Sequence, residues 1–411
     1  MKKYYNLIVI LFLLTIALNA EVKKIEIIIK NSAEIALEEY SVNLNFNQFA
    51  AFSGLNEINF IIKEYDNIVP FQIYETEKNK KIVFNINLKP KESKILELIY
   101  GDEIKQPIFN PRVYAELSMK QNDVYYEKRF RGSEFTRVKK IKVPAIHTDH
   151  DALFKFEGPG WESELVGYRF YLDWRNTSDI FGKKTNELIL STVGVHDTVA
   201  KDDSYHTMQD WGMDIFKVGN SLGIGSIGMW ANNKVNMVAK TDSIFCEIKS
   251  TGPIRAEIIT NYYGWLVGNN KYDLESKLSI LAGSRLTKVD LAIKNAENII
   301  TGLAKHPNTE MFQSTGKGKW DYLALYGKQT LVNDQDKLGI AIFYKLVDKI
   351  ETSEDDINYL IKLRPKNDKV TYYFAAAWEQ EKNGIKTLED FKKYLDDTLI
   401  RLENPVTIKI K

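Results

Sequence analysis

The chain has 411 residues but only one cysteine, Cys246, so it cannot form an internal disulfide bond. A chain of this length can bury enough apolar surface for packing to supply its stability instead. An excess of charge of one sign is also missing, because 56 Lys and Arg residues face 55 Asp and Glu residues, for a net charge of +1. No overall field attracts a polyanion, so we expect no nucleic-acid partner.

Long apolar segments are scarce as well. Residues 7–18 form an apolar run that only Thr15 interrupts, and Lys2 and Lys3 precede it. About 18 or more apolar residues are needed to span a bilayer, so this run is short for a membrane helix and is typical of a secretory signal. We expect a signal peptide over residues 1–20, export to the periplasm or the medium, and no membrane association after cleavage.

Tryptophan and histidine are absent from the first 146 residues. All seven Trp and all five His residues lie between His147 and Trp378. Trp offers a broad flat face to a ligand, and His changes its charge near neutral pH. This distribution indicates a front part that supports the fold and a back part that carries the function.

The front part reads as a series of short β-strands whose side chains alternate between apolar and polar. Strands at this spacing predict an antiparallel β-sandwich over residues 21–103, which we interpret as an accessory domain. Residues 104–146 contain three prolines and many basic side chains, and we expect them to form a crossing segment. The alternating segments of the front part are residues 23–30, 40–46, 81–88 and 94–100.

The back part, residues 147–411, is again dominated by strand-like segments. Together with the front part it predicts an all-β protein, whose second domain is a large antiparallel sandwich of two curved sheets with few helices. One helix is expected near the C-terminus, where Thr387 can cap an apolar stripe of helical period. Residues 406–410 then alternate as a last strand.

A first group of chemically useful side chains lies in residues 154–183, where charged and aromatic residues are interleaved. In a strand, alternation places Arg169, Tyr171 and Asp173 on one face and Tyr168 on the other. If the first face lines a groove, Arg169 can bind a carboxylate, Asp173 can bind hydroxyl groups, and an aromatic ring can stack on a sugar. The alternative is a solvated sheet face with ordinary ion pairs.

A second group contains His206, Asp210 and Asp214, which are spaced four residues apart. On a helix they would share a face, whereas the glycines that follow favour a loop. In either geometry Asp210 can orient His206 for general acid–base chemistry. The three side chains could also bind a divalent ion such as Ca2+, the one candidate ion; no other cofactor is expected. A purely structural hydrogen bond is the alternative.

A third candidate pair is His306 with Glu310, which flank a turn containing Pro307. They could act as an acid–base couple at the exit of a strand, or His306 could be a structural loop residue. Further along the chain, three alanines precede Trp378 and would leave room for a ligand beside its ring.

Five segments of the chain are similar to a bacterial family of uncharacterised exported proteins that carry a galactose-mutarotase-like supersandwich domain and occur in polysaccharide-utilisation gene clusters. The resemblance implies a broad antiparallel sandwich whose concave face binds sugar. It also implies that a His and a carboxylate move a proton, with His206, His306, Glu164 and Asp210 as the comparable groups. The gene context of the family implies uronate-containing glycans. The segments are residues 110–116, 157–183, 210–230, 251–258 and 302–306.

These observations lead to the hypothesis of an exported enzyme that acts on acidic oligosaccharides or polysaccharides by lyase or dehydratase chemistry. Arg169 would bind the carboxylate, His206 or His306 would act as base, and Tyr168 or Tyr171 would act as acid. A non-catalytic glycan-binding protein, a sugar epimerase and a glycosidase that uses two of Glu162, Glu164, Asp173 and Asp210 remain alternatives. The substrate-binding candidates are Trp161, Trp211, Asp173, Glu162 and Trp378.

Overall fold

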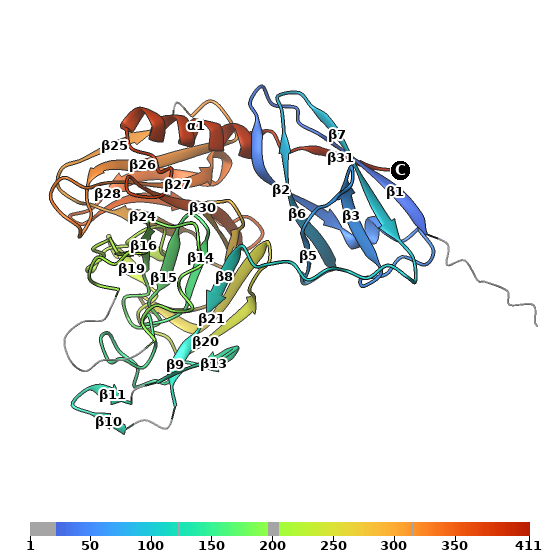
Figure 1. Ribbon diagram of the computed structural model, residues 1–411. Helices are drawn as coiled ribbons and strands as arrows, with labels where there is room; N and C mark the ends of the chain where they lie inside the picture. Colours follow the sequence, from blue (N-terminus) through green and yellow to red (C-terminus); the bar gives the residue numbers. More distant parts are fainter. Residues whose placement is uncertain (1–21, 122–123, 133, 196–204, 315) are drawn as a thin grey trace, which may run out of the picture.

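The computed structural model describes residues 22–121, 124–132, 134–195, 205–314 and 316–411. Within these ranges the chain is built almost entirely of antiparallel β-strands, with one α-helix, which confirms the all-β prediction. Figure 1 shows an N-terminal sandwich in blue beside a larger layered body that contains the green, yellow and orange strands.

The N-terminal sandwich consists of two facing sheets. Alternation in β1 buries Ile25, Ile27 and Ile29 completely, and they pack with Phe84 of the facing sheet. One sheet has the order β31 (Thr407–Ile410), β1 (Lys23–Lys30), β7 (Ser93–Tyr100), β3 (Phe60–Glu64) and β4 (Asn67–Ile68). The other has the order β2 (Leu37–Asn45), β6 (Lys80–Leu88) and β5 (Phe71–Glu75).

The larger body is organised around a nine-stranded sheet. Side chains of one of its faces share a continuous apolar core with two five-stranded sheets. Tyr168 of a five-stranded sheet, for example, lies edge-on to Phe374 of the large sheet, with ring centroids 5.2 Å apart. The nine strands are β13 (Lys140–Lys142), β20 (Ser243–Ser250), β21 (Arg255–Val267), β22 (Asn270–Leu281), β23 (Leu286–Ile293), β30 (Lys369–Trp378), β27 (Lys337–Lys345), β26 (Trp320–Lys328) and β25 (Thr309–Gln313).

The first five-stranded sheet is called the site sheet below, because its outer face carries the candidate site. It has the order β17 (Gly212–Asp214), β16 (Ser178–Lys183), β15 (Gly167–Phe170), β14 (Gly160–Ser163) and β8 (Val113–Glu116). The second has the order β19 (Lys234–Met237), β18 (Gly228–Ala231), β24 (Ile299–Ala304), β29 (Asn358–Leu363) and β28 (Lys349–Glu354). Two small pairs complete the body: β9 (Ser118–Lys120) with β12 (Phe135–Arg137), and β10 (Val124–Tyr126) with β11 (Arg129–Arg131).

The single helix, α1 (Leu388–Glu403), covers the other face of the nine-stranded sheet (Figure 1). Thr387 caps it, since its hydroxyl accepts a hydrogen bond from the Asp390 amide at 3.1 Å, as the sequence predicts. Phe391 and Leu395 are fully buried against Tyr326 and neighbouring side chains of β26, β27 and β30. The body therefore has three layers: helix, large sheet and paired small sheets.

The structure corrects two of the domain boundaries expected from sequence. Strand β31 pairs with β1, so the last residues of the chain return to the N-terminal sandwich instead of belonging to the second domain. Strand β8, expected within a crossing segment, is the edge strand of the site sheet and pairs with β14. Both pairings join residues far apart in the chain, and local alternation does not specify such partners.

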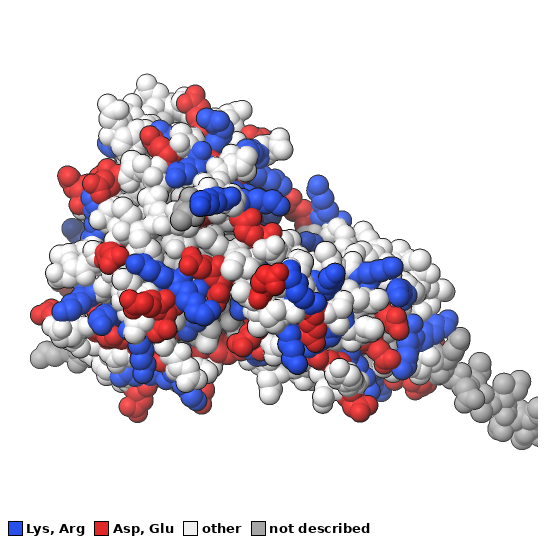
Figure 2. Space-filling model, turned by 90° about the horizontal axis from the view of Figure 1, so that it is seen from above, with Lys and Arg blue, Asp and Glu red and all other residues white. Residues whose placement is uncertain are grey.

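Among the residues described, no helix is both long enough and apolar enough to cross a membrane. The predicted signal peptide and His196 lie outside the described residues. On the face shown in Figure 2, acidic and basic side chains are interspersed, in keeping with the balanced composition.

Candidate active site

Charged residues gather on the outer face of the site sheet, because successive side chains of a strand point to opposite faces of the sheet. Tyr168 and Phe170 of β15 point into the core, while Arg169 between them points outward. Cross-strand pairing places Arg169 opposite Asp179 of β16, and Phe181 opposite Asp214 of β17. Three ionisable side chains from three adjacent strands are therefore brought together.

Arg169 is the centre of this charged network. Its Nη2 lies 2.7 Å from Asp179 Oδ2 and 2.5 Å from Asp214 Oδ2, and its Nε donates to Asp179 at 3.0 Å. Only 3% of the residue is exposed. The proposed role of Arg169 in binding a substrate carboxylate is therefore wrong in its simple form, because the guanidinium already neutralises two buried carboxylates of the protein.

The hydroxyl of Tyr171 donates to Asp179, and this phenol is buried as well. Burial is the main reason that its pKa lies well above the ordinary value of 10. Burial and the nearby charge of Asp214 raise the pKa of Asp179 to about 6, although Arg169 opposes this shift. Tyr171 thus stabilises the Asp179 carboxylate, and because its phenol is buried it is poorly placed to donate a proton to a ligand.

His206 lies at the accessible end of the network. Its Nδ1 is 3.3 Å from Asp214 Oδ2, and 52% of its side chain is exposed. The imidazole rests against the buried ring of Tyr205, with centroids 4.4 Å apart. A carboxylate close to Nδ1 favours the tautomer with its proton on that nitrogen, which is a feature of oriented acid–base histidines.

The carboxylate beside His206 belongs to Asp214 and not to Asp210, the partner predicted from sequence. Asp210 is exposed in a turn in which the Gln209 and Gly212 backbones bond each other, so the helical spacing of four does not apply. Asp214, in the strand that follows, takes its place. Among the described residues, no three His, Cys, Asp or Glu side chains gather as metal ligands, so the Ca2+ hypothesis gains no support.

A second histidine, His150, lies at the other end of the same network. Its Nδ1 is 3.3 Å from Asp149 Oδ2 and 3.9 Å from Glu157 Oε1, and Glu157 Oε2 is 3.8 Å from Arg169 Nη1. Trp174 donates its indole N–H to Asp149 at 2.7 Å and remains 44% exposed. Ion pairs and hydrogen bonds thus connect two exposed imidazoles through buried charges.

Backbone strain accompanies this arrangement. His150, Glu157 and Asn176 have φ values of 59°, 63° and 47°, a region that residues with a Cβ seldom occupy. Such conformations are retained where the surrounding structure enforces them, often at functional sites. The position of His150 at this network was not predicted, because the sequence around it shows only acidic neighbours.

Two predicted polar contacts of the substrate are structural ion pairs. Glu162 is fully buried, accepts a bond from Lys183 Nζ at 2.7 Å and receives the Leu190 amide at 2.7 Å. Asp173 is 3% exposed and holds Arg175 through both carboxylate oxygens. We correct both predictions, because neither carboxylate is open to a ligand.

Two predicted aromatic substrate contacts, Trp161 and Trp378, and one predicted catalytic acid, Tyr168, are core residues. Trp161 is 1% exposed and donates to Thr287 Oγ1 at 2.9 Å, and Trp378 donates to Asp336 Oδ2 at 2.6 Å. Tyr168 donates to the Arg285 carbonyl at 2.8 Å inside the sandwich. All three rings are packed inside the sandwich, so none of them is open to a ligand. Trp211 differs, since it is only partly buried and packs against Phe181 beside Tyr205.

The remaining two candidates lie elsewhere. His306 packs on Phe216, with centroids 5.1 Å apart, and burial lowers its pKa below the ordinary value of 6.5. Glu164 pairs with Arg112, which also bonds Glu39 of the N-terminal sandwich at 2.8 Å. The structure therefore does not bring His306 or Glu164 to the His206 network, contrary to the expectation.

Comparisons with known proteins identify the family of this chain, one curated relative and two distantly similar structures. A curated relative, "Uncharacterized protein P7" of Formosa agariphila, is 25% identical over 224 residues, which are 52% of this chain and 54% of the relative. The match thus spans about half of the length of that relative. Two solved Enterococcus faecalis structures also match, a protein in glycosyl hydrolase family 38 and an α-mannosidase of strain V583.

Their identities are 9% and 10%, and their TM-scores are 0.43 and 0.44; each match covers 94% of this chain but 47% and 46% of the other chain. Likenesses of this size carry no functional argument. The match to a family model is far more extensive, since it runs from residue 29 to residue 408. The chain therefore belongs to the family described as "Domain of unknown function (DUF4861)".

Proposed function

We propose that this protein is an exported carbohydrate-active enzyme in which His206 removes a proton from a sugar ring. The single observation that carries the proposal is the contact of 3.3 Å between His206 Nδ1 and Asp214 Oδ2 on a half-exposed imidazole. Asp214 would fix the tautomer of the ring and stabilise the imidazolium formed when Nε2 takes the proton.

The reaction class that suits this base is β-elimination at a uronic acid residue. His206 takes the proton α to the carboxylate, the C–O bond at the β carbon breaks, and the departing oxygen receives a proton. Loss of a sugar alcohol makes the enzyme a lyase, whereas loss of water makes it a dehydratase. We assign proton donation to His150, because it is exposed and is linked to His206 through Glu157, Arg169 and Asp214.

A sugar substrate is supported by exposed indole surface and by the resemblance of the sequence to supersandwich proteins. Trp174 is held by Asp149 while its ring remains accessible, and Trp211 is partly exposed beside Tyr205. Aromatic faces of this kind stack on sugar rings. A glycosidase is less favoured, because Glu157, Asp173 and Asp214 are committed to Arg169 or Arg175.

The proposal is tested by incubating the full chain with uronate oligosaccharides and following product mass together with the absorbance of unsaturated sugars. Chain cleavage without water supports a lyase, and loss of water supports a dehydratase. Gain of water would indicate a glycosidase, and binding without turnover would indicate a glycan-binding protein; either result contradicts the proposal.

Two histidine variants sharpen this test. His206→Gln should lower kcat by about 10²- to 10⁴-fold, the usual contribution of a general base. His306→Gln should retain activity, because His306 lies apart from the network. Loss of activity in His306→Gln but not in His206→Gln would instead identify His306 as the base.

A further inference from the structure

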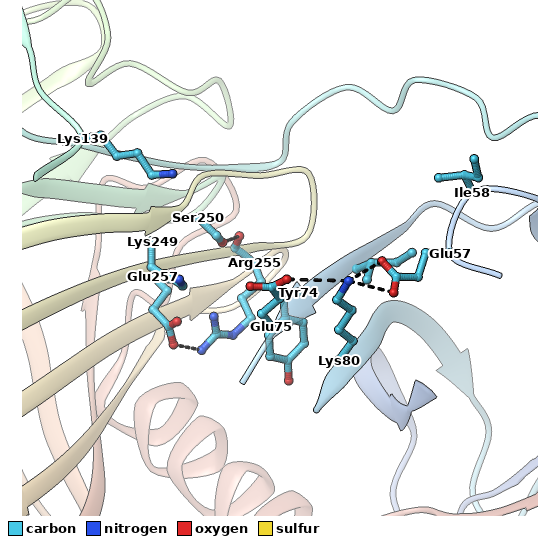
Figure 3. Close-up of a pocket in the computed structure, with 11 residues that line it drawn as sticks. Glu57, Ile58, Tyr74, Glu75, Lys80, Lys139, Lys249, Ser250, Arg255 and Glu257 are labelled. Atoms are coloured by element: carbon cyan, nitrogen blue, oxygen red, sulfur yellow. Dashed lines mark hydrogen bonds and ion pairs between the residues drawn. The ribbon is translucent and has the colours of Figure 1, made fainter. Parts of the chain in front are cut away.

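A cleft of about 450 Å3 lies between the N-terminal sandwich and the nine-stranded sheet (Figure 3). Tyr74 of β5 and Lys80 of β6 line one side, and Lys249 of β20 and Arg255 of β21 line the other. Small-ligand sites in proteins usually measure about 300–1,000 Å3. This interdomain cleft therefore has the size of a site for a short ligand, and both domains build it.

The cations of the cleft outnumber its carboxylates. Lys80 lies 2.7 Å from Glu57 and 3.7 Å from Glu75, so it is neutralised within the protein. Arg255 pairs with Glu257. Lys139 and Lys249 are exposed, and neither forms an ion pair within the described part of the chain. The backbones of Lys139 and Lys249 lie close together, since the amide of Ile248, which precedes Lys249, donates to the Lys139 carbonyl at 2.8 Å.

Arg255 forms a fixed, incompletely bonded part of the cleft. The side chain of Gln72 holds its backbone by accepting from the Arg255 amide at 2.8 Å and donating to the carbonyl at 3.1 Å. The guanidinium carbon lies 4.6 Å from the centre of the Tyr74 ring. Its Nη1 is buried without a hydrogen-bond partner among the described residues, and such a donor is costly unless a bound group accepts from it.

We propose that the interdomain cleft binds an oligosaccharide that carries an anionic group, either a carboxylate or a sulfate ester. Lys139 and Lys249 would bind the anion directly, and the positive charge of Arg255 in the same cleft would add to the attraction. The carboxylates of Glu75 and Glu257 would accept from sugar hydroxyls, and Tyr74 would offer an apolar edge. A densely charged polyanion fits this mixed lining poorly, because three carboxylates share the cleft. This site is separate from His206 and does not depend on its catalytic role.

The test measures equilibrium binding to the full chain carrying His206→Gln, which prevents turnover. The probes are a galacturonate tetramer, a sulfated neutral tetramer and the same neutral tetramer without sulfate. One variant combines Lys139→Ala with Lys249→Ala. The matched control combines Lys240→Ala with Lys294→Ala, two exposed lysines outside the cleft that form no ion pair within the described ranges.

We expect the cleft variant to weaken binding of at least one anionic tetramer by about tenfold or more, while the control stays within about twofold of the parent. The anionic tetramer that binds more tightly identifies the natural group. Unchanged melting temperatures would show that both variants fold. Equal affinities of the two variants, no binding of either anionic probe, or equally tight binding of the neutral tetramer would overturn the proposal.

The same variants separate this proposal from that for His206. With His206 restored, the Lys240→Ala and Lys294→Ala control should turn over a short substrate as the parent does, which tests the His206 proposal without the cleft. Loss of turnover in His206→Gln with cleft binding intact supports both sites, and failure of one leaves the other standing.

Discussion

At the scale of single residues, the site depends on one buried cation, Arg169, which holds the carboxylates of Asp179 and Asp214. Alternation correctly separates Arg169 from Tyr168, because a strand has a period of two whatever its neighbours are. It cannot show that Asp179 and Asp214 face Arg169, since these come from two other strands. His206 was identified as a candidate, but its carboxylate partner is Asp214 and not Asp210, because the segment is not a helix.

Arg169→Ala should destabilise the protein by about 3–5 kcal/mol, since it leaves two buried carboxylates without their cation. The free energy of unfolding in urea checks this. Adding Asp179→Asn and Asp214→Asn should recover part of the loss. A fully stable but inactive Arg169→Ala protein would instead support the role in substrate binding expected from sequence.

Asp179 should make stability depend on pH. Its folded pKa of about 6 lies above the ordinary value of 3.8, so between these values the folded chain holds a proton that the unfolded chain releases. The free energy of unfolding should therefore fall as pH rises from about 4 to about 6, and then level off as far as this group is concerned. Unfolding curves of wild type and Asp179→Asn measure the effect, and identical pH slopes would contradict it.

At the scale of elements, the strands and the helix with strong local periodicity were predictable from sequence, but the pairing of strands within the sheets was not. Apolar spacing and the Thr387 cap predict β1, β2, β6, β7 and α1, whereas the shorter strands β3, β4 and β5 were not predicted. Strands β14–β17 are only three to six residues long and are buried on both faces, so alternation between apolar and polar side chains is faint there. Strand β31 was expected as a strand, but its partner β1 lies at the other end of the chain.

The strand β31 should stabilise the N-terminal sandwich through one face only. Ile408 packs on the apolar core of the sandwich, whereas Lys409 is exposed. Ile408→Asp should lower the free energy of unfolding by about 1–2 kcal/mol, as expected for a partly buried side chain. Lys409→Asp is the matched control and should change it by less than about 0.5 kcal/mol. Equal effects of the two substitutions would show that β31 contributes little through packing.

At the scale of the whole molecule, the two domains form one unit. Arg112 bonds both Glu39 and Glu164, Gln72 bonds Arg255, and β31 closes the chain onto its first strand. The segregation of Trp and His predicts a functional part of the chain behind residue 146. It did not separate core from site, because Trp161, Trp265 and Trp378 are buried while Trp174 is exposed. Long-range packing decides that difference, and the sequence of a single chain does not display it.

The most direct measurement of the central claim is exchange of the hydrogen α to the carboxylate of a uronate oligosaccharide, followed by NMR in deuterated water together with formation of unsaturated product. We expect the wild type to remove this hydrogen at a rate at least about 10²-fold above that of a folded His206→Gln variant. Equal rates in the two proteins, or product formation that leaves this hydrogen in place, would contradict the assignment of His206 as the base.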